Sequence, residues 1–276
     1  MRALLVHNPF SRRRLRKKEI DIIVNEMSVD YTTDIFETKG QGSITEYRKN
    51  HGDSYDLVIA CGGDGTIHEA ACGILLCQKK PKLALIPRGT MNDVARCYKM
   101  PKSVRKCVKI IQKGNTEIHS TYRINDTFFL YGMAIGRYAA VSYVADKKRE
   151  LGRLAYYLAC VKEFFRTKPI DVTINGNKKR LSQVFILNTN YLAGYKVEVK
   201  KSDNISLHEL RFKNKISDTF RFFFFLTSKA KKHSTILEDD EFIIEGDNLF
   251  FTLDGERYIS SYAKIKKNLD SIEIIR

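Results

Sequence analysis

Three features that often assign a chain to a class are absent from this sequence. No apolar run approaches the roughly 20 residues that a membrane-spanning helix needs. The longest candidate, residues 220–226, contains Arg221. The first apolar strand begins at residue 3, so we expect no signal peptide. The 6 cysteines include no Cys-x-x-Cys pair and no histidine cluster accompanies them, which argues against a zinc site. We therefore expect a reduced, cytoplasmic protein.

Acidic residues are too few to balance the basic ones. The 276 residues include 48 Lys and Arg but 32 Asp and Glu, which gives a formal net charge of +16. This excess predicts an anionic partner: nucleic acid, an acidic membrane surface or a phosphorylated substrate. A lysine-rich surface without a specific partner is the alternative, because net charge reports on solubility and association and not on a site.

The Gly-Gly-Asp-Gly-Thr turn at residues 62–66 is the most informative stretch that is present. It follows an apolar strand at residues 57–60 and precedes a helix whose apolar face includes Ile67 and Ile74. Glycines allow close backbone approach, and a helix N-terminus offers N–H groups to phosphate. Asp64 among these amides indicates that a cation or an activated hydroxyl is also handled. The turn is neither a Walker A loop nor Gly-x-Gly-x-x-Gly.

Polar turns recur after the other strands of the first half. Strands alternate with helices there, which predicts a layered, mostly parallel sheet. Ligands of such sheets bind beyond the carboxyl ends of the strands. Asn8, Thr38, Asp64 and Thr90 each follow a predicted strand, so we expect these four loops to converge on one cleft. Helices are predicted at residues 91–98 and 102–113, and another through Ile44 and Tyr47.

Basic residues crowd the start of the first predicted helix, at residues 12–14 and 16–18. Cations at a helix N-terminus oppose the macrodipole, which favours a role in holding phosphates beside the strand end. A solvated run of charge explains them equally well.

The second half reads mainly as strands, which predicts a largely antiparallel β domain interrupted by a helix at residues 152–165. We place the first domain at residues 1–117 together with a C-terminal strand at 265–276, and the second domain at 118–264. The candidate strands are residues 128–133, 170–174, 184–189, 209–212, 242–244, 249–253 and 271–275.

Asp254-Gly255 between extended segments is an ordinary hairpin signal, and this interpretation is favoured by the residues alone. The alternative is that Glu256 reaches a cleft as a functional carboxylate.

Taken together, the motifs resemble the soluble bacterial diacylglycerol kinases, within the superfamily of lipid, sphingosine and NAD kinases. They run in family order over nearly the whole chain, and the two glycine turns in combination are highly specific. The motifs are Asn8-Pro9-x-Ser11, Thr38-x-x-x-Gly42, Gly62-Gly63-Asp64-Gly65-Thr66-x-x-Glu69, Pro87-x-Gly89-Thr90-x-Asn92-Asp93, Thr189-Asn190 with Gly194, and Asp254-Gly255-Glu256.

The resemblance implies an α/β nucleotide-binding domain and a C-terminal β-sandwich, with the active site between them and with ATP and Mg²⁺ as cofactors. Glu256 would be the general base, and Asp64 and Asp93 would belong to the Mg²⁺ and phosphate network. The residues expected to bind ATP are Asn8, Pro9, Phe10, Ser11, Arg12, Thr38, Gly62, Gly63, Asp64, Gly65, Thr66, Ile67, His68, Thr90 and Asn92.

The expected acceptor is a lipid hydroxyl, with diacylglycerol first, at an anionic membrane surface on the cytoplasmic side. A homodimer is one candidate assembly, and no nucleic acid is expected. The aromatic run at residues 222–225 is interpreted either as an acyl-chain pocket or, with more weight, as packed core. The cations expected to dock on headgroups are Lys147, Lys148, Arg149, Lys229, Lys231 and Lys232.

Three departures from the family pattern keep other functions open. Arg12 stands where the pattern has glycine, and His119 stands where close relatives carry a catalytic aspartate. The structural Mg²⁺ of relatives rests on an Asp-Gly turn that residues 202–209 lack, and Asp203 is out of register for it. The alternatives are a kinase for phosphatidylglycerol, a sphingoid base or undecaprenol, and a nucleotide- or lipid-binding protein without catalysis.

Overall fold

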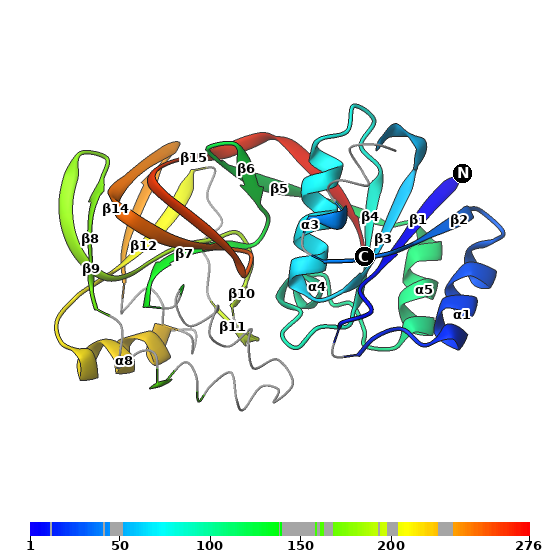
Figure 1. Cartoon of the computed structure of the whole chain (residues 1–276), viewed down its shortest axis with the longest axis horizontal. Coiled ribbons are helices and arrows are strands. Elements are labelled where there is room, and N and C mark those ends of the chain that lie inside the picture. The colour runs from blue at the N-terminus through cyan, green and yellow to red at the C-terminus, as the bar shows by residue number, and fades with distance from the viewer. Residues whose placement is uncertain are drawn as a thin grey trace. The chain divides into compact units, whose positions relative to one another are not determined.

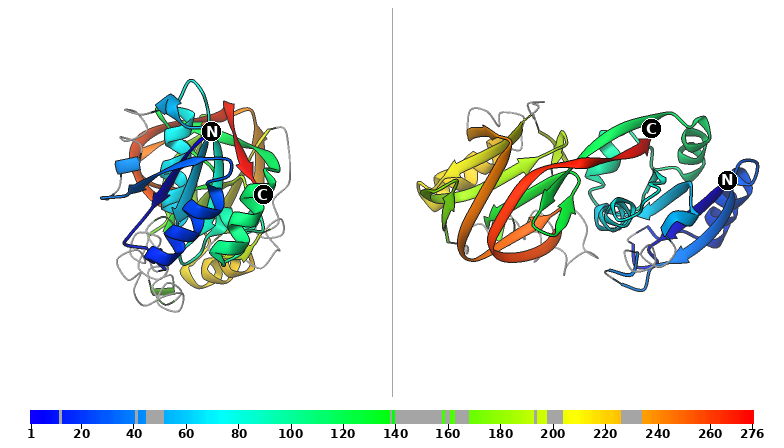
Figure 2. Two further views of the ribbon diagram at one scale, coloured as in Figure 1. Left: turned by 90° about the vertical axis from the view of Figure 1, so that its right-hand side faces the viewer. Right: turned by 90° about the horizontal axis from the view of Figure 1, so that it is seen from above.

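The computed structural model describes residues 1–11, 13–40, 42–44, 52–137, 139, 158, 161–162, 168–192, 194–197, 204–225 and 234–276. The chain forms two compact units, Met1–Ser120 with Leu269–Arg276, and Thr121–Asn268. Both joins lie inside strands, β5 (Thr116–Ile124) and β15 (Glu256–Ile275). Figure 2 shows β15 as one long orange-to-red strand. The predicted boundaries, at 117/118 and 264/265, therefore lie a few residues before the observed ones, within the same strands.

The first unit is built on a parallel sheet of strand order β2-β1-β3-β4, with Ile274 of β15 paired in parallel to Leu83. The inner strands β1, β3 and β4 are almost completely buried, as expected when helices cover both faces of a parallel sheet. The last predicted strand therefore returns to this unit. The bounds are β1 (Arg2–His7), β2 (Thr32–Glu37), β3 (Leu57–Gly62) and β4 (Lys82–Pro87).

Helices of the first unit pack in two pairs, α1 with α5 and α3 with α4 (Figure 1). Asn92 has a left-handed φ of 54°, so α4 begins at Asp93 and not at residue 91. Gly114, with φ of 68°, ends α5. The predicted helix through Ile44 and Tyr47 lies largely outside the described residues. The bounds are α1 (Lys17–Met27), the short 3-10 helix η1 (Gly52–Ser54), α3 (Asp64–Leu75), α4 (Asp93–Cys97) and α5 (Val104–Lys113).

The second unit is antiparallel and rich in strands, so the predicted sequence of an α/β domain followed by a β domain is confirmed. Strands β7 and β8 each pair with both β9 and β14, and a large apolar cluster fills the interior. The bounds are β6 (Thr127–Phe129), β7 (Gly132–Gly136), β8 (Ile170–Ile174), β9 (Asn177–Leu187), β10 (Tyr191–Leu192), β11 (Tyr195–Lys196), β12 (Ile205–Arg211), α8 (Lys215–Phe224), β13 (Thr235–Asp239) and β14 (Glu241–Leu253).

Several predicted elements of the second unit are wrong in detail. The strand expected at residues 128–133 is two strands, β6 and β7, and the two strands expected at 242–244 and 249–253 are the single strand β14. The register of β14 shifts between Glu245 and Leu249, which explains the apparent gap in its pattern. The helix expected at residues 152–165 lies almost wholly outside the described residues. No helix in the described part of the chain is long and apolar enough to span a bilayer.

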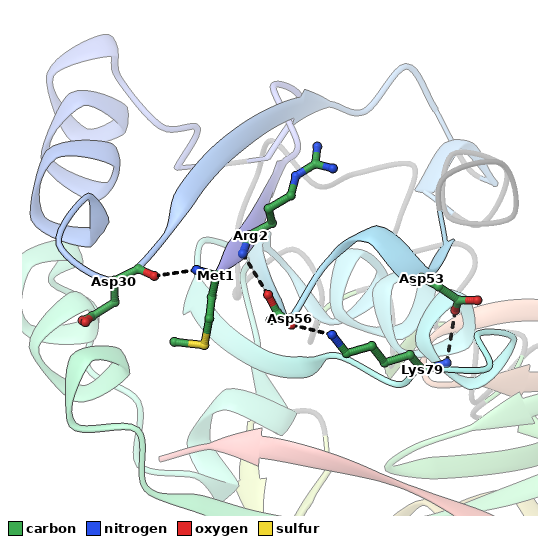
Figure 3. Close-up of polar contacts among 6 residues, drawn as sticks. All are labelled: Met1, Arg2, Asp30, Asp53, Asp56 and Lys79. Carbon is green, nitrogen blue, oxygen red and sulfur yellow. Dashed lines mark hydrogen bonds and ion pairs between the residues drawn. The ribbon is translucent and has the colours of Figure 1, made fainter.

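The amino ends of β1 and β3 carry a network of polar contacts, most of which join a charged group to the backbone (Figure 3). One carboxylate, Asp56, accepts the backbone N–H of Arg2 at 2.9 Å and the Lys79 ammonium at 2.6 Å. Asp53 accepts the backbone N–H of Lys79 at 3.1 Å, and the terminal ammonium of Met1 donates to a carbonyl oxygen at Asp30. These contacts tie the connections at this end of the sheet to one another.

Candidate active site

Glycines allow the backbone of the turn between β3 and α3 to pack closely against its neighbours. Gly63 is the residue before α3 and provides no side-chain cap. The first N–H groups of any helix have no partner within the helix, so this end can receive an anion. A Cβ atom on Gly62 would lie 2.3 Å from Oγ1 of Thr66, which excludes a side chain there. The strand-to-helix turn that the sequence predicted is therefore present, and its anion-binding role stays a prediction.

The second turn, between β4 and α4, lies directly against the first. The N–H of Arg88 donates to the Gly62 carbonyl oxygen at 2.7 Å. A Cβ atom on Gly89 would lie only 2.5 Å from Cα of Gly63. The close approach therefore requires glycine at position 89 and leaves little room for a side chain at position 63, where a Cβ atom would lie 3.2 Å from Cα of Gly89. The two motifs, read separately, did not show this contact.

Asn92 closes the second turn with both ends of its amide. Its Oδ1 accepts the N–H of Gly89 at 2.8 Å, and its Nδ2 donates to the Gly89 carbonyl at 2.8 Å. The N–H of Val94, in the first turn of α4, donates to Oδ1 of Asp64 at 3.2 Å. This bond brings the buried Asp93, the neighbour of Val94, into the region of Asp64. Thr90 lies within the same turn.

The loop after β1 joins this arrangement at the end of the sheet. The N–H of Asn8 donates to the Cys61 carbonyl at 3.2 Å, and the Arg13 N–H donates to the Arg88 carbonyl at 3.3 Å. Oδ1 of Asn8 accepts the Phe10 N–H at 2.8 Å, which folds the loop through Pro9 toward Ser11. Arg12 lies outside the described residues. From β1 the chain first adds β2 on one side of the sheet and then β3 on the other, so the topology has a switch point between β1 and β3. Open α/β sheets commonly bind ligands at such a point.

Thr38 reaches the same end of the sheet by its backbone, which donates to the His7 carbonyl at 3.0 Å. The loop after it is held by Glu69 of α3, whose carboxylate accepts the N–H of Gly42 at 2.6 Å and of Ile44 at 3.4 Å. Glu69 belongs to the motif at residues 62–69, but the sequence did not indicate its role. Four of the predicted loops thus meet at the carboxyl ends of the parallel strands.

Two residues that were predicted to bind ATP, Ile67 and His68, have side chains that contact other parts of the first unit. Ile67 is fully buried, and its N–H makes the first bond of α3, to the Gly63 carbonyl at 3.1 Å, so its side chain belongs to the core. His68 has its Nε2 3.6 Å from Sγ of Cys72, one turn along the helix.

His119, the residue that departs from the family pattern, is buried, with Nδ1 2.6 Å from the Tyr98 hydroxyl. Burial raises the pKa of that hydroxyl.

The basic side chain inside the second turn, Arg88, has a partner that sequence reasoning missed. Its guanidinium is almost fully buried and lies 2.6 Å from a carboxylate oxygen of Glu19 on α1. Burial raises the pKa of Glu19, but hydrogen bonds from the Arg16 backbone and from Arg88 outweigh it, so the pKa is lowered. Arg88 therefore braces the turn against α1. By contrast, the side chain of Arg16 is mostly exposed, as a solvated charge would be.

The hairpin predicted at Asp254-Gly255 joins β14 to β15, and the two residues have φ of 53° and 93°. The sequence did not reveal the role of the aspartate. Its buried carboxylate accepts three backbone N–H groups, from Leu130 at 2.6 Å, Tyr131 at 2.8 Å and Gly132 at 2.9 Å. These bonds interrupt the expected strand at residues 128–133. They also hold the turn that immediately precedes Glu256, the first residue of β15 in the second unit.

The donor set for Mg²⁺ is small. Within the described ranges, no group of three or more His, Cys, Asp or Glu side chains could hold a metal ion. Mg²⁺ commonly uses one or two carboxylates and takes its remaining ligands from phosphates and water. Asp64 and Asp93 are two such carboxylates. Asp203, the carboxylate nearest to the structural-metal turn that this sequence lacks, lies outside the described residues.

Comparisons with known proteins agree with this architecture. Residues 2–123 match the diacylglycerol kinase catalytic domain. The chain is 31% identical over 202 residues to a diacylglycerol kinase of Staphylococcus aureus, and the match covers 70% of this chain and 64% of that protein. The chain thus spans less than two thirds of the length of that relative.

Two solved structures show the same fold. One is a diacylglycerol kinase from Bacillus anthracis str. Sterne, with a TM-score of 0.75, 21% identity, and coverage of 99% of this chain and 96% of that chain. The other is an NAD kinase from Archaeoglobus fulgidus in complex with ATP, with a TM-score of 0.58, 14% identity, and coverage of 100% and 94%.

Proposed function

We propose that this chain is an ATP-dependent lipid kinase, because residues 2–123 match the diacylglycerol kinase catalytic domain and the chain is 31% identical over 202 residues to a diacylglycerol kinase. It transfers the γ-phosphoryl group to a lipid hydroxyl, with diacylglycerol as the first candidate and phosphatidic acid as the product. It acts at the cytoplasmic face of a membrane. The observation that carries the proposal is the contact of two glycine turns beside the N-terminus of α3.

The residues divide the work of phosphoryl transfer, which needs positioning and charge neutralisation more than covalent chemistry. The amides of the 62–66 turn bind phosphate oxygens, and the Asn8 and Thr38 loops line the nucleotide. Asp64 and Asp93 would hold Mg²⁺, which would supply positive charge beside the phosphates. Glu256 takes the proton of the acceptor hydroxyl as general base.

The test is transfer of labelled phosphate from ATP to diacylglycerol in mixed micelles by the full chain. Parallel reactions contain phosphatidylglycerol, a sphingoid base, undecaprenol or no acceptor. We expect Glu256→Gln to lower turnover by about 10²–10⁴-fold, the range for a lost acid–base group. We expect Asp64→Ala, which removes a carboxylate assigned to the metal, to lower turnover as well. Asp64→Asn serves as the matched variant, because the amide oxygen can still accept the Val94 N–H. Turnover like that of the wild type in both Glu256→Gln and Asp64→Ala would overturn the assignment.

A second candidate is a nucleotide-binding protein without turnover. The observation that favours it is His119, which is buried against Tyr98 where the resemblance leads one to expect a catalytic aspartate. In that case ATP binds to the chain in calorimetry and no acceptor in the panel becomes labelled.

A further inference from the structure

Helix α8 is firmly attached to the second unit by one face. Its first turn is capped by Asn214, whose Oδ1 accepts the Ser217 N–H at 2.8 Å. On the inner face, Phe222 and Phe225 stack on Phe185 of β9, with ring centroids 6.1 and 5.0 Å away. The packed-core interpretation of residues 222–225 is thus confirmed for these two rings. Figure 1 shows α8 lying beside this sheet.

The opposite face of α8 is apolar as well. Ile216, Phe220 and Phe224 are 64%, 61% and 45% exposed. Residues four apart share one face of a helix, so these three side chains form a single stripe, which we call the α8 stripe. Single exposed apolar residues are ordinary, but a contiguous set of three large ones marks an interaction surface.

Basic groups border the α8 stripe at its N-terminal end. Arg211 and Lys213 are exposed and directly precede the helix. Arg180 is also exposed, and its carbonyl accepts the Phe212 N–H at 3.4 Å. Its guanidinium lies 3.9 Å from the exposed carboxylate of Asp171, so β9 adds a third cation that an anionic headgroup would have to share with that carboxylate. The only acidic residue in the α8 sequence is Asp218, which is buried. No exposed carboxylate of α8 therefore opposes an anionic surface.

We propose that the α8 stripe docks the protein on an anionic lipid bilayer, a role that rests on the proposed function as a lipid kinase. An apolar helical stripe beside cations is the pattern of helices that lie in the membrane interface. The rings enter the boundary between headgroups and acyl chains, and the three cations bind anionic headgroups. The surface therefore selects membranes that combine negative charge with accessible acyl chains.

The test measures binding of the full chain to vesicles of phosphatidylcholine with and without phosphatidylglycerol, in the absence of ATP. We expect Phe220→Ser to weaken binding to anionic vesicles by about tenfold, the effect of losing one partly buried phenyl ring. Arg180→Gln with Lys213→Gln should reduce the salt dependence of binding. Leu76→Ser, at a residue 58% exposed at the end of α3, is the control that leaves binding unchanged.

A second measurement reports insertion directly. The chain has no tryptophan, so Phe220→Trp introduces a single fluorescent indole. Its emission should shift to the blue on anionic vesicles and be quenched by brominated lipid, whereas Leu76→Trp should show neither change. An unshifted emission of Phe220→Trp together with unchanged binding of Phe220→Ser overturns the proposal. So does a drop in oligomeric mass of Phe220→Ser without a change in vesicle binding, which would assign the stripe to a second copy.

These experiments can refute the docking surface and the kinase activity independently of each other. A short-chain diacylglycerol that is monomeric in water tests turnover without a bilayer, and Phe220→Ser should match the wild type there. Vesicle binding without turnover on any acceptor refutes the kinase and leaves the docking surface intact. Turnover without vesicle binding refutes the docking surface alone.

Discussion

At the amino ends of β1 and β3, carboxylates are matched with cations and amides, whereas at the carboxyl ends two glycine turns press against each other. Asp56 and Asp34 at the amino ends accept hydrogen bonds from Lys79 and Arg2. At the carboxyl ends, Gly63 and Gly89 are in contact where side chains would collide. At one end of these strands side chains form hydrogen bonds and ion pairs, and at the other end the backbones of two turns are in contact.

We expect the largest loss of stability from removing a buried carboxylate that holds backbone N–H groups. Asp254 is a buried counterpart of the amino-end carboxylates, and Asp254→Ala leaves three buried N–H groups without their acceptor. We expect a loss of about 3–5 kcal/mol in the free energy of unfolding, measured by chemical denaturation. Asp254→Asn should cost less, because one acceptor oxygen remains. Asp247→Ala, on the exposed part of β14, is the matched control. If Asp254→Ala lowers the free energy of unfolding no more than Asp247→Ala does, the three buried hydrogen bonds to Asp254 do not stabilise the fold.

Next in size is a test of the glycine contact itself. Gly89→Ala places a methyl group 2.5 Å from Cα of Gly63, so the two turns must separate. A displacement of about 1 Å can lower turnover roughly 100-fold, and overpacking costs about 1–3 kcal/mol. Transfer of labelled phosphate to diacylglycerol measures the turnover, and thermal melting measures the stability. Calorimetry measures the affinity for ATP, which we also expect to fall. Gly40→Ala, which has nothing within 4 Å, should leave the melting temperature unchanged. Full ATP affinity in Gly89→Ala would contradict a nucleotide role for this contact.

The amino end should respond to mutation in stability and not in ligand binding. Asp56→Ala removes the acceptor of the Arg2 N–H and the ion pair with Lys79. Because the pair is partly exposed, we expect a cost of about 1 kcal/mol and an unchanged KM for ATP. A raised KM with unchanged stability would reverse the roles assigned to the two ends.

The smallest effect is a difference in pH dependence. Burial lowers the pKa of His7, at the carboxyl end of β1, although Glu37 raises it. The unfolded chain therefore takes up a proton near pH 6.5 more readily than the folded one, and stability falls as the pH drops below 6.5. The hydrogen bond from Lys79 lowers the pKa of Asp56, so its contribution is present above 3.8 and is lost in more acidic solution.

Denaturation curves across this pH range separate the two ends. His208 in the second unit, whose pKa burial lowers to about 4, adds its own decline below 6.5, so the comparison is between variants. His7→Gln should flatten part of the decline below pH 6.5, and Asp56→Asn should alter only the more acidic part. The same curve for His7→Gln and the wild type would exclude His7 from the pH response.

Sequence patterns located the elements of the first unit well because its parallel strands are apolar along their whole length. Residues 57–60 and 83–86 are such runs, and each is followed by a turn with its own chemistry. The residues of the two glycine turns were likewise predictable, since a strand-to-helix turn that holds phosphate needs small residues and free amides. Glu69, quoted only as part of a motif, shows the limit: its role depends on Gly42, which is distant in sequence.

The sequence by itself determined the order of strands and helices, the excess of positive charge and the two turns. Only the tertiary structure decided that Gly63 and Gly89 touch, that Asp254 binds the 130–132 backbone, and that α8 buries Phe222 while exposing Phe220. Local periodicity and turn chemistry act over a few residues, and the sequence can display them. Contacts between residues such as Leu130 and Asp254 depend on how strands pair across the sheet, and no local pattern records that pairing.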